Sequence, residues 1–277
     1  MSDPFSPYRR VKVTRVGRAR AGTGEDLAAA EEPLEIRLHG RPFAVIMRTP
    51  GRDRELAAGF LLSEGILRSS SDLGAVEHCR HPDHPDVHNV VDVYLMGEAA
   101  QQVARHLDER RNVLTSSSCG LCGRLTIDSL RVTIEPLVSP QAIDRDLAAA
   151  LPARLRERQR VFDETGGLHA AALFGLDGDF ETSAEDVGRH NAVDKVIGAM
   201  LLEDRLPLEG RVLVVSGRTS FEILQKAWIA GIAIVCAVSA PSSLAIELAE
   251  EAGITLLGFV RDGGFNLYTH GHRISGV

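Results

Sequence analysis

Residues 211–260 read RVLVVSGRTSFEILQKAWIAGIAIVCAVSAPSSLAIELAEEAGITLLGFV, and this stretch decides the fold class. It contains three short apolar runs, RVLVVS, IAIVCAVS and ITLLGFV, which are typical of buried strands. Between them lie two segments with helical spacing, each beginning with Ser or Thr residues that can cap a helix. The alternation of strand and helix predicts an α/β fold with a sheet rich in parallel pairs.

The preceding residues extend the same unit. Residues 170–183 alternate apolar and polar positions and predict a hairpin that turns at Asp177-Gly178. Residues 189–203 have the spacing of an amphipathic helix. The predicted order is therefore hairpin, helix, strand, helix, strand, helix and strand, within a C-terminal domain over residues 138–277.

The N-terminal part has a mixed pattern, so we expect a mixed α+β domain over residues 1–137, of which residues 1–30 are partly irregular. The domain boundary is expected near Ser139-Pro140, which can begin a helix, and Pro152 should interrupt that helix. Asp53 is expected to cap the first helix. The expected elements of this domain are a strand near 11–16, a hairpin over 34–48 that turns at His39-Gly40, a helix over 54–65, a strand over 88–95 and a helix over 98–108.

Composition excludes several classes of protein. The 277-residue chain has a hydrophobic fraction of 44%, which suffices for a sizeable core, and a net charge of −7. The negative charge argues against nonspecific binding to nucleic acid or to acidic membranes. The sequence has no run of about 18 apolar residues that would cross a membrane, and its N-terminus lacks the apolar region of a secretory signal. We therefore expect a cytoplasmic protein with no nucleic-acid and no membrane partner.

Four cysteines are too few for a disulfide framework in a chain of this length. Cys236 lies in an apolar run and is expected to be an inert core thiol, whereas Cys79 lies in a polar loop. Cys119 and Cys122 form a C-x-x-C motif within TSSSCGLCGR. The motif alone leaves five interpretations open: structural zinc, a thioredoxin-type dithiol, an iron–sulfur cluster, two incidental cysteines, or a sulfur-carrying nucleophile.

The surroundings of the motif favour the nucleophile. The sequence lacks a second cysteine pair for zinc, has too few cysteines for a cluster, and places a Ser-rich loop before the motif. Only a thiolate attacks sulfur, and the hydroxyls of residues 116–118 and the nearby arginines can stabilise one on Cys119. Gly120 and Gly123 free the backbone, so that one sulfur can be presented to two partners. Cys122 is then close enough to protect or resolve a persulfide.

This loop resembles the signature of the formate dehydrogenase accessory sulfurtransferase family (FdhD). Five further blocks resemble the family in the same order and extend the resemblance over roughly residues 34–272: ELAAGFLLSEGIL, TGGLHAAAL, EDVGRHNAVDKVIG, SGRTSFE and FNLYTH. The resemblance implies that Cys119 carries a persulfide and that its sulfur comes from a cysteine desulfurase. The sulfur is then passed to molybdenum bis(molybdopterin guanine dinucleotide), a bound substrate that the formate dehydrogenase catalytic subunit needs. A homodimer is also implied.

The resemblance further implies a cytidine-deaminase-like, three-layer fold for the C-terminal domain. Zinc deaminases carry His or Cys followed by Ala-Glu at the start of a helix, and P-C-x-x-C at the next strand-to-helix junction. The corresponding segments here are His190-Asn191-Ala192 and Gly217-Arg218-Thr219. We therefore expect no zinc and no deaminase activity. Asp186 and His190 are interpreted as ligand-binding residues or as buried polar supports.

Two segments are candidates for binding the cofactor, including its GDP-like moiety. Arg218, Thr219 and Ser220 lie where a strand meets a helix N-terminus, so backbone N–H groups and a guanidinium can bind phosphate there. The alternative is an ordinary capped junction. The family associates an FNLYTH-type segment with the pterin cofactor, and the alternative is a terminal strand. That segment comprises Phe265, Asn266, Leu267, Tyr268, Thr269 and His270.

The loop over residues 78–88 offers Cys79, His81, His84 and His88, whose spacing could hold a transition metal. Its prolines and aspartates favour a solvated loop, and we predict no metal site. Two other functions stay open. One is a chaperone that binds the cofactor without covalent sulfur chemistry, and the other is a thiol–disulfide oxidoreductase that uses the C-x-x-C pair.

Overall fold

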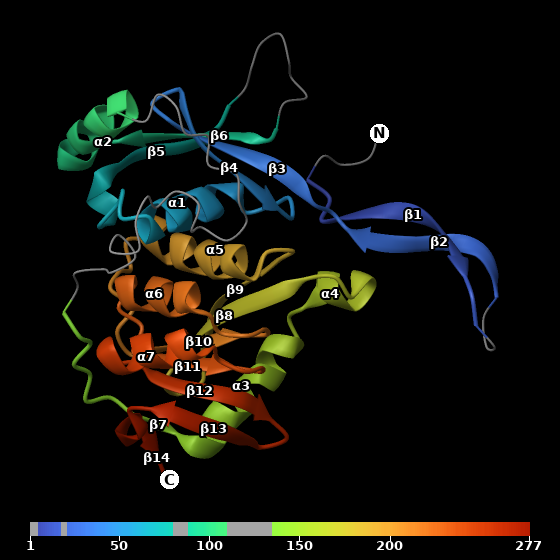
Figure 1. The fold of residues 1–277 in the computed structure, drawn as a ribbon, viewed down its shortest axis with the longest axis vertical. Coiled ribbons are helices and arrows are strands. Elements are labelled where there is room, and N and C mark those ends of the chain that lie inside the picture. Colours follow the sequence, from blue (N-terminus) through green and yellow to red (C-terminus); the bar gives the residue numbers. More distant parts are fainter. Residues whose placement is uncertain (1–4, 18–20, 80–87, 110–134) are drawn as a thin grey trace.

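The computed structural model describes residues 5–17, 21–79, 88–109 and 135–277, with the side chains of 104–109 left out. Figure 1 shows a layered body from which a two-stranded arm projects. In the described part of the chain, no helix is long and apolar enough to cross a membrane.

The centre of the body is a six-stranded sheet in the order β13-β12-β11-β10-β8-β9. Its strands are β8 (His169–Gly175), β9 (Phe180–Asp186), β10 (Arg211–Val215), β11 (Ile234–Ala237), β12 (Thr255–Arg261) and β13 (Gly264–Thr269). The three predicted apolar strands form β10, β11 and β12, which are parallel neighbours. The other three pairings are antiparallel. The expected predominance of parallel pairs is therefore wrong, because an antiparallel strand pair flanks the parallel centre on each side.

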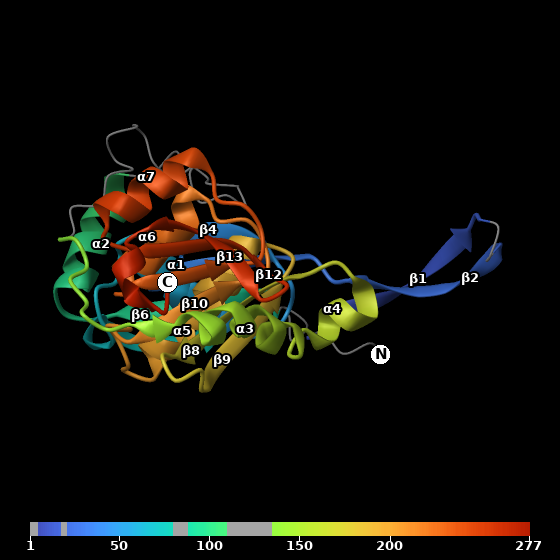
Figure 2. The same ribbon diagram turned by 90° about the horizontal axis from the view of Figure 1, so that it is seen from below.

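Helices cover both faces of this sheet. α5 (Arg189–Leu202), α6 (Phe221–Ile229) and α7 (Ser243–Glu251) pack on one face, and α3 (Arg145–Arg156) packs on the other. Side chains alternate accordingly along β10, where Leu213 joins the first cluster and Val214 joins the second. Figure 2 shows α3 on the opposite side of β12 and β13 from α6 and α7. The predicted α/β class and the order of elements are confirmed.

The N-terminal half forms a four-stranded sheet in the order β4-β3-β6-β5. Its elements are β3 (Glu32–Leu38), β4 (Arg41–Arg48), α1 (Asp53–Ser63), β5 (Leu73–His78), β6 (Val90–Leu95) and α2 (Gly97–Glu109). The predicted turn at His39-Gly40 is confirmed, and both residues adopt positive φ angles, of 51° and 77°. α1 and α5 lie between the two sheets (Figure 1).

α1 and α5 touch through their backbones. A Cβ atom on Gly198 of α5 would lie 1.9 Å from the carbonyl oxygen of Glu55, and one on Gly59 of α1 would lie 2.0 Å from that of Asp194. One hydrophobic cluster continues from the four-stranded sheet through these helices to the six-stranded sheet. The limits 1–137 and 138–277 stay a prediction about domains, and both parts contribute to this shared core.

The N-terminal segment differs from its expected irregular form. β1 (Tyr8–Arg15) and β2 (Gly22–Ala29) pair antiparallel along their whole lengths and form the projecting arm. The single strand expected near 11–16 is therefore one half of a hairpin. Its partner was missed because GTGEDLAA has few β-branched or aromatic residues, and only the pairing makes it a strand.

Three expectations about helices are also wrong. Asp53 does not cap α1, because both of its carboxylate oxygens accept hydrogen bonds from the Arg48 guanidinium, each at 2.9 Å. Arg52 occupies the N-cap position instead, with a left-handed backbone. The helix after Ser139-Pro140 begins only at Arg145, where Asp144 caps it, and it continues past Pro152. Packing of Leu151 and Leu155 in the core outweighs the hydrogen bond that proline cannot donate.

Candidate functional site

The carboxyl end of β10 collects five of the predicted site residues: Asp186, His190, Arg218, Thr219 and Ser220. Ser216 to Ser220 connect β10 to α6. Because β8 runs antiparallel to β10, the first residue of β8, His169, lies at the same end of the strands as Ser216. Asp186, the last residue of β9, is the register partner of His169. The topology therefore brings the β8–β9 hairpin together with the carboxyl end of β10, which comes later in the sequence.

A cavity of about 1070 Å³ opens at this end of the strands, and α3 and α4 (Arg160–Thr165) form its other walls. Its apolar wall comes largely from α3, and its polar groups come from both sides. The polar side chains are Asp146, Arg156, Gln159, His169, Ser216, Arg261 and Asp262. Its volume is at the upper end of the range of about 300–1,000 Å³ that is usual for ligand pockets. The sequence analysis did not predict this pocket. The available signal was the pair Gly166-Gly167 shortly before His169, because glycines leave space beside the backbone, and both line the pocket.

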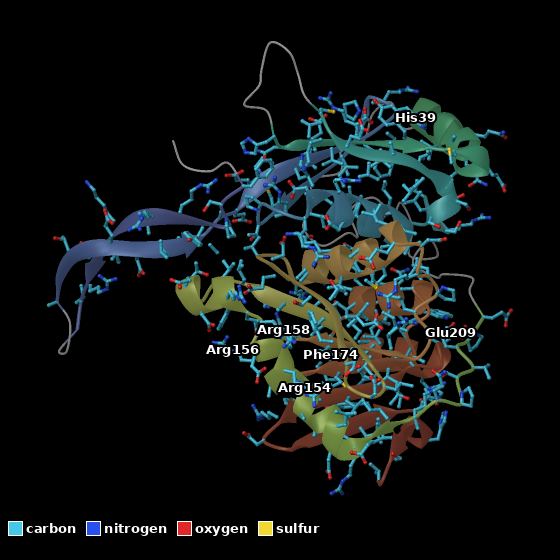
Figure 3. The ribbon with its side chains drawn as sticks, turned by 180° about the vertical axis from the view of Figure 1, so that it is seen from behind. His39, Arg154, Arg156, Arg158, Phe174 and Glu209 are labelled. Atoms are coloured by element: carbon cyan, nitrogen blue, oxygen red, sulfur yellow. The ribbon has the colours of Figure 1, made fainter. Side chains whose placement is uncertain are left out.

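One arginine of α3, Arg156, lines this cavity. Figure 3 shows Arg154, Arg156 and Arg158 close together at the carboxyl end of the helix. Arg154 donates a hydrogen bond of 2.9 Å to the carbonyl of Gly178, and the Arg158 guanidinium stacks on Phe180 with 4.0 Å to the ring centroid. These contacts fix α3 to the β8–β9 hairpin and leave Arg156 on the cavity wall.

His169 lines the cavity, and its pKa is lowered. Burial lowers its pKa, and the positive charges of Arg189 and Arg218 lower it further. Gly217 gives it room, since a Cβ there would lie 3.2 Å from the imidazole Nδ1. A lowered pKa keeps this imidazole neutral at pH 7, so one ring nitrogen can donate to a ligand and the other can accept.

Asp186 is a buried support. The Asn191 side chain and the backbone N–H groups of Thr49 and Gly188 donate to its oxygens, at 2.9, 3.2 and 2.8 Å. Lys195 forms an ion pair with it at 2.7 Å, and the carboxylate is fully buried. Of the two interpretations, the geometry favours the polar support, because four protein groups already occupy the carboxylate.

His190 lies between two polar side chains of the α6 N-terminus. Its Nε2 is 3.1 Å from the Ser220 hydroxyl, and its Nδ1 is 2.9 Å from a carboxylate oxygen of Glu222. The imidazole is largely buried, whereas Ser220 is half-buried. Sequence reasoning had identified His190 and Ser220, but it missed Glu222, which lies beside His190 in the first turn of the helix.

The junction Arg218-Thr219-Ser220 has features of an anion site. Arg218 is exposed, and Thr219 is buried. The Thr219 hydroxyl has no hydrogen-bond partner among the residues that the structure describes, and the same is true of the Arg189 Nε. Buried polar groups are normally hydrogen-bonded, so these two groups have unused hydrogen-bonding capacity, as does the nearby Glu222 Oε2.

The segment Phe265–His270 falls largely within β13, which is the outer strand on the side of the sheet opposite to β9. Because β13 is antiparallel to β12, Thr269 pairs with Leu256 near the start of β12, away from the carboxyl ends of the parallel strands. Thr269 donates to the carbonyl of Ile254 at 2.6 Å, and His270 contacts that of Glu250 at 2.9 Å. The Thr269 end of this segment is thus far from Asp186, His190 and Arg218, whereas its Phe265 end follows Arg261, Asp262 and Gly263, which line the cavity.

Side chains along β13 have different surroundings. Phe265 and Leu267 pack against the α3 cluster, and Tyr268 packs against the other one, with its ring over Gly258. A role of Phe265, Asn266, Leu267, Tyr268, Thr269 and His270 in cofactor binding stays a prediction.

Cys119 and Cys122 lie outside the described residues, as do His81 and His84. Burial raises the pKa of Cys236 to about 12 and also raises the pKa of Cys79. Both thiols are therefore poor nucleophiles at neutral pH. Over the described ranges, no group of three or more His, Cys, Asp or Glu side chains is arranged to hold a metal ion.

Comparison with known proteins adds independent information. The sequence model of the FdhD/NarQ family matches residues 29–275. The chain is 50% identical to the protein named Sulfur carrier protein FdhD of Streptomyces avermitilis, over 96% of this chain and 95% of that protein. It is 48% identical to the protein of that name from Mycolicibacterium paratuberculosis, over 96% and 98%.

A solved structure shares the fold. The crystal structure of a putative formate dehydrogenase accessory protein from Desulfotalea psychrophila matches with a TM-score of 0.77 and 23% identity. The match covers 97% of this chain and 100% of that one. At this level of identity the likeness supports the fold alone.

Proposed function

Because the chain belongs to the FdhD/NarQ family, we propose that it is a sulfur carrier protein with an accessory role toward formate dehydrogenase. The observation that supports this most strongly is the near-complete coverage of relatives named as sulfur carriers, at about half identity. The C-x-x-C motif supplies the chemistry that such a protein needs. The protein would act in the cytoplasm as a sulfurtransferase and as a homodimer.

The sulfur transfer is proposed to occur at Cys119. Its thiolate attacks the outer sulfur of a persulfide on a cysteine desulfurase, and the desulfurase leaves as a thiolate. Cys119 then holds the sulfur as a persulfide until the acceptor takes it, and the Cys119 thiolate is restored. Cys122 would protect the intermediate. The raised pKa values of Cys79 and Cys236 support this choice, because those two thiols are poorly suited to attack.

The acceptor is proposed to be molybdenum bis(molybdopterin guanine dinucleotide), bound as a substrate for delivery to the formate dehydrogenase catalytic subunit. The cavity beside Ser216 has room for a nucleotide, and His169 presents a neutral imidazole to it. Arg218 and the unpaired Thr219 hydroxyl at the head of α6 fit phosphate. These residues would bind the GDP-like moiety, whereas Asp186 would act by holding the surrounding backbone.

The decisive experiment is intact-mass spectrometry after incubation with a cysteine desulfurase and cysteine. The wild type should gain the mass of one sulfur atom, Cys119→Ala should gain none, and Cys236→Ala should behave like the wild type. A sulfur that maps only to Cys122 or Cys79 would contradict the assignment of Cys119.

A second arm separates the carrier from the two other functions. Cys119→Ala should still bind GDP in calorimetry, because the thiol lies outside the proposed nucleotide pocket. If delivery of an active cofactor survives replacement of both Cys119 and Cys122, the protein is a noncovalent chaperone. If the pair forms a reversible disulfide and never a persulfide, it is a thiol–disulfide oxidoreductase.

A further inference from the structure

Three side chains at the heads of α5 and α6 lie next to one another in the order serine, histidine and glutamate. The Ser220 hydroxyl is 3.1 Å from His190 Nε2, and His190 Nδ1 is 2.9 Å from Glu222 Oε2. The contact between Nδ1 and Oε2 has the distance of an ion pair but not the alignment of a hydrogen bond, and Oε2 has no hydrogen-bond partner among the described residues. A small rotation that lets Nδ1 donate its proton to the carboxylate would leave Nε2 as an acceptor for the serine hydroxyl. The order hydroxyl, imidazole and carboxylate is that of an activated serine nucleophile, which is recognised by geometry and not by sequence order.

Ser220 is unusual for a residue at a helix N-cap. The α6 N-cap side chain makes no capping hydrogen bond, whereas Ser242, the N-cap of the neighbouring α7, accepts one from the Ala245 N–H at 3.2 Å. Two N-cap serines at the same end of the parallel strands thus have different hydrogen-bond partners. The hydroxyl of Ser220 is directed to an imidazole, although a capping bond was available to it.

Glu222 is held in place by buried contacts. Glu222 lies 3.6 Å from the Lys226 ammonium, which also forms a buried ion pair with Asp194 at 2.9 Å. Ser63 of α1 donates to Asp194 at 2.9 Å. Ser220 itself is half-buried, so a small reagent can reach it. A fixed carboxylate and imidazole behind a reachable hydroxyl are what nucleophilic catalysis needs.

We propose that Ser220, His190 and Glu222 form a catalytic triad that acts on esters of small acyl groups. His190 Nε2 takes the proton of Ser220 as its Oγ bonds to the ester carbonyl carbon. The bond to the alcohol oxygen then breaks, and His190 returns the proton to that alcohol. Water attacks the acyl-serine with His190 again as the base, which releases the carboxylic acid and restores Ser220. The first-turn N–H groups of α6 can stabilise the oxyanion, because they have no carbonyl partner within the helix.

The test uses the full-length protein, a biotin-linked fluorophosphonate and peptide mapping by mass spectrometry. The wild type should be labelled at Ser220, and Ser220→Ala should not be labelled. His190→Gln removes the base and should slow labelling at least about a hundredfold. Glu222→Gln should slow it at least about tenfold. Ser242→Ala is the matched control, because it removes an N-cap serine with no imidazole partner, and it should be labelled like the wild type.

Hydrolysis of p-nitrophenyl acetate gives a second readout on the same variants, and each variant's melting temperature shows whether it is folded. Labelling elsewhere, or labelling of Ser220 at the same rate in folded His190→Gln, would overturn the triad. No labelling of the folded wild type would also overturn it. The experiment contains no molybdenum cofactor and no sulfur donor, so its result is independent of persulfide formation on Cys119.

Discussion

Burial and two guanidinium groups both lower the pKa of His169, the residue at the start of β8. His169 has a lowered pKa because burial disfavours its charged form and because Arg189 and Arg218 repel a proton. The residue type alone would suggest a group that titrates near neutral pH. Its position at the cavity makes it a neutral hydrogen-bonding group, which suits the recognition of a nucleotide base or sugar.

The lowered pKa of His169 predicts a dependence of stability on pH. In the unfolded chain this histidine takes up a proton as the pH falls through about 6.5, whereas in the folded protein it resists protonation to lower pH. The unfolded state then binds more protons, so the free energy of unfolding decreases as the pH falls from 7.5 to 5.5. Denaturant titrations of the wild type and His169→Asn at both pH values should show a smaller decrease for the variant. An equal decrease would mean that His169 contributes nothing.

The contact between α1 and α5 depends on two residues that have no side chain. Gly59 and Gly198 let the two backbones approach so closely that the carbonyl oxygens of Glu55 and Asp194 occupy the space of a Cβ atom. Ser63, Asp194 and Lys226 then connect these helices to α6 by buried hydrogen bonds. The N-terminal sheet is thereby held against the helices that carry His190 and Ser220.

Gly198→Ala should strongly destabilise the protein. The new Cβ would lie 1.9 Å from the Glu55 oxygen, and neither backbone can move without displacing a helix. Overpacking usually costs about 1–3 kcal/mol, and a backbone clash belongs at or above the upper end of this range. Denaturant unfolding measures the loss.

Gly264→Ala is the control for this prediction. Its nearest neighbour would be a carbonyl oxygen at 3.9 Å, and its free energy of unfolding should change by less than about 1 kcal/mol. Equal stabilities of the Gly198→Ala and wild-type proteins would show that the two helices can separate at little cost.

The whole molecule consists of a continuous layered body and an arm that packs mainly on itself. Contacts with the body occur at the base of the arm, where Ala30 donates to the carbonyl of Pro7 at 2.8 Å and Arg9 pairs with Glu32, and where β2 packs against α4. Farther out, the two strands pair only with each other (Figure 1). An isolated two-stranded hairpin is at best marginally stable in water, so the outer arm should add little to the stability of the body.

Shortening the arm should therefore leave the body intact. Arg9 and Ala28 are register partners, so residues 10–27 can be replaced by Asn-Gly, which forms a tight hairpin turn. The melting temperature should change by no more than about 2 °C, because distant surface changes cost less than about 0.5 kcal/mol. Thermal unfolding of dilute protein measures this. A large decrease, with a smaller assembly in size-exclusion chromatography, would instead show that the arm holds two copies together.

Local pattern in the sequence determined the α/β class, the order of elements from β8 to β12 and the turns at His39-Gly40 and Asp177-Gly178, because apolar period and turn residues act over a few neighbours. It also identified His190, Ser220 and the C-x-x-C pair as chemically capable residues. Tertiary structure alone decided that Glu222 lies beside His190, that Asp186 is a buried support, and that the Thr269 end of β13 lies away from the carboxyl ends of the parallel strands. The physical reason is that strand order and helix packing bring together residues far apart in the chain, and no local pattern encodes which strand becomes the neighbour of which.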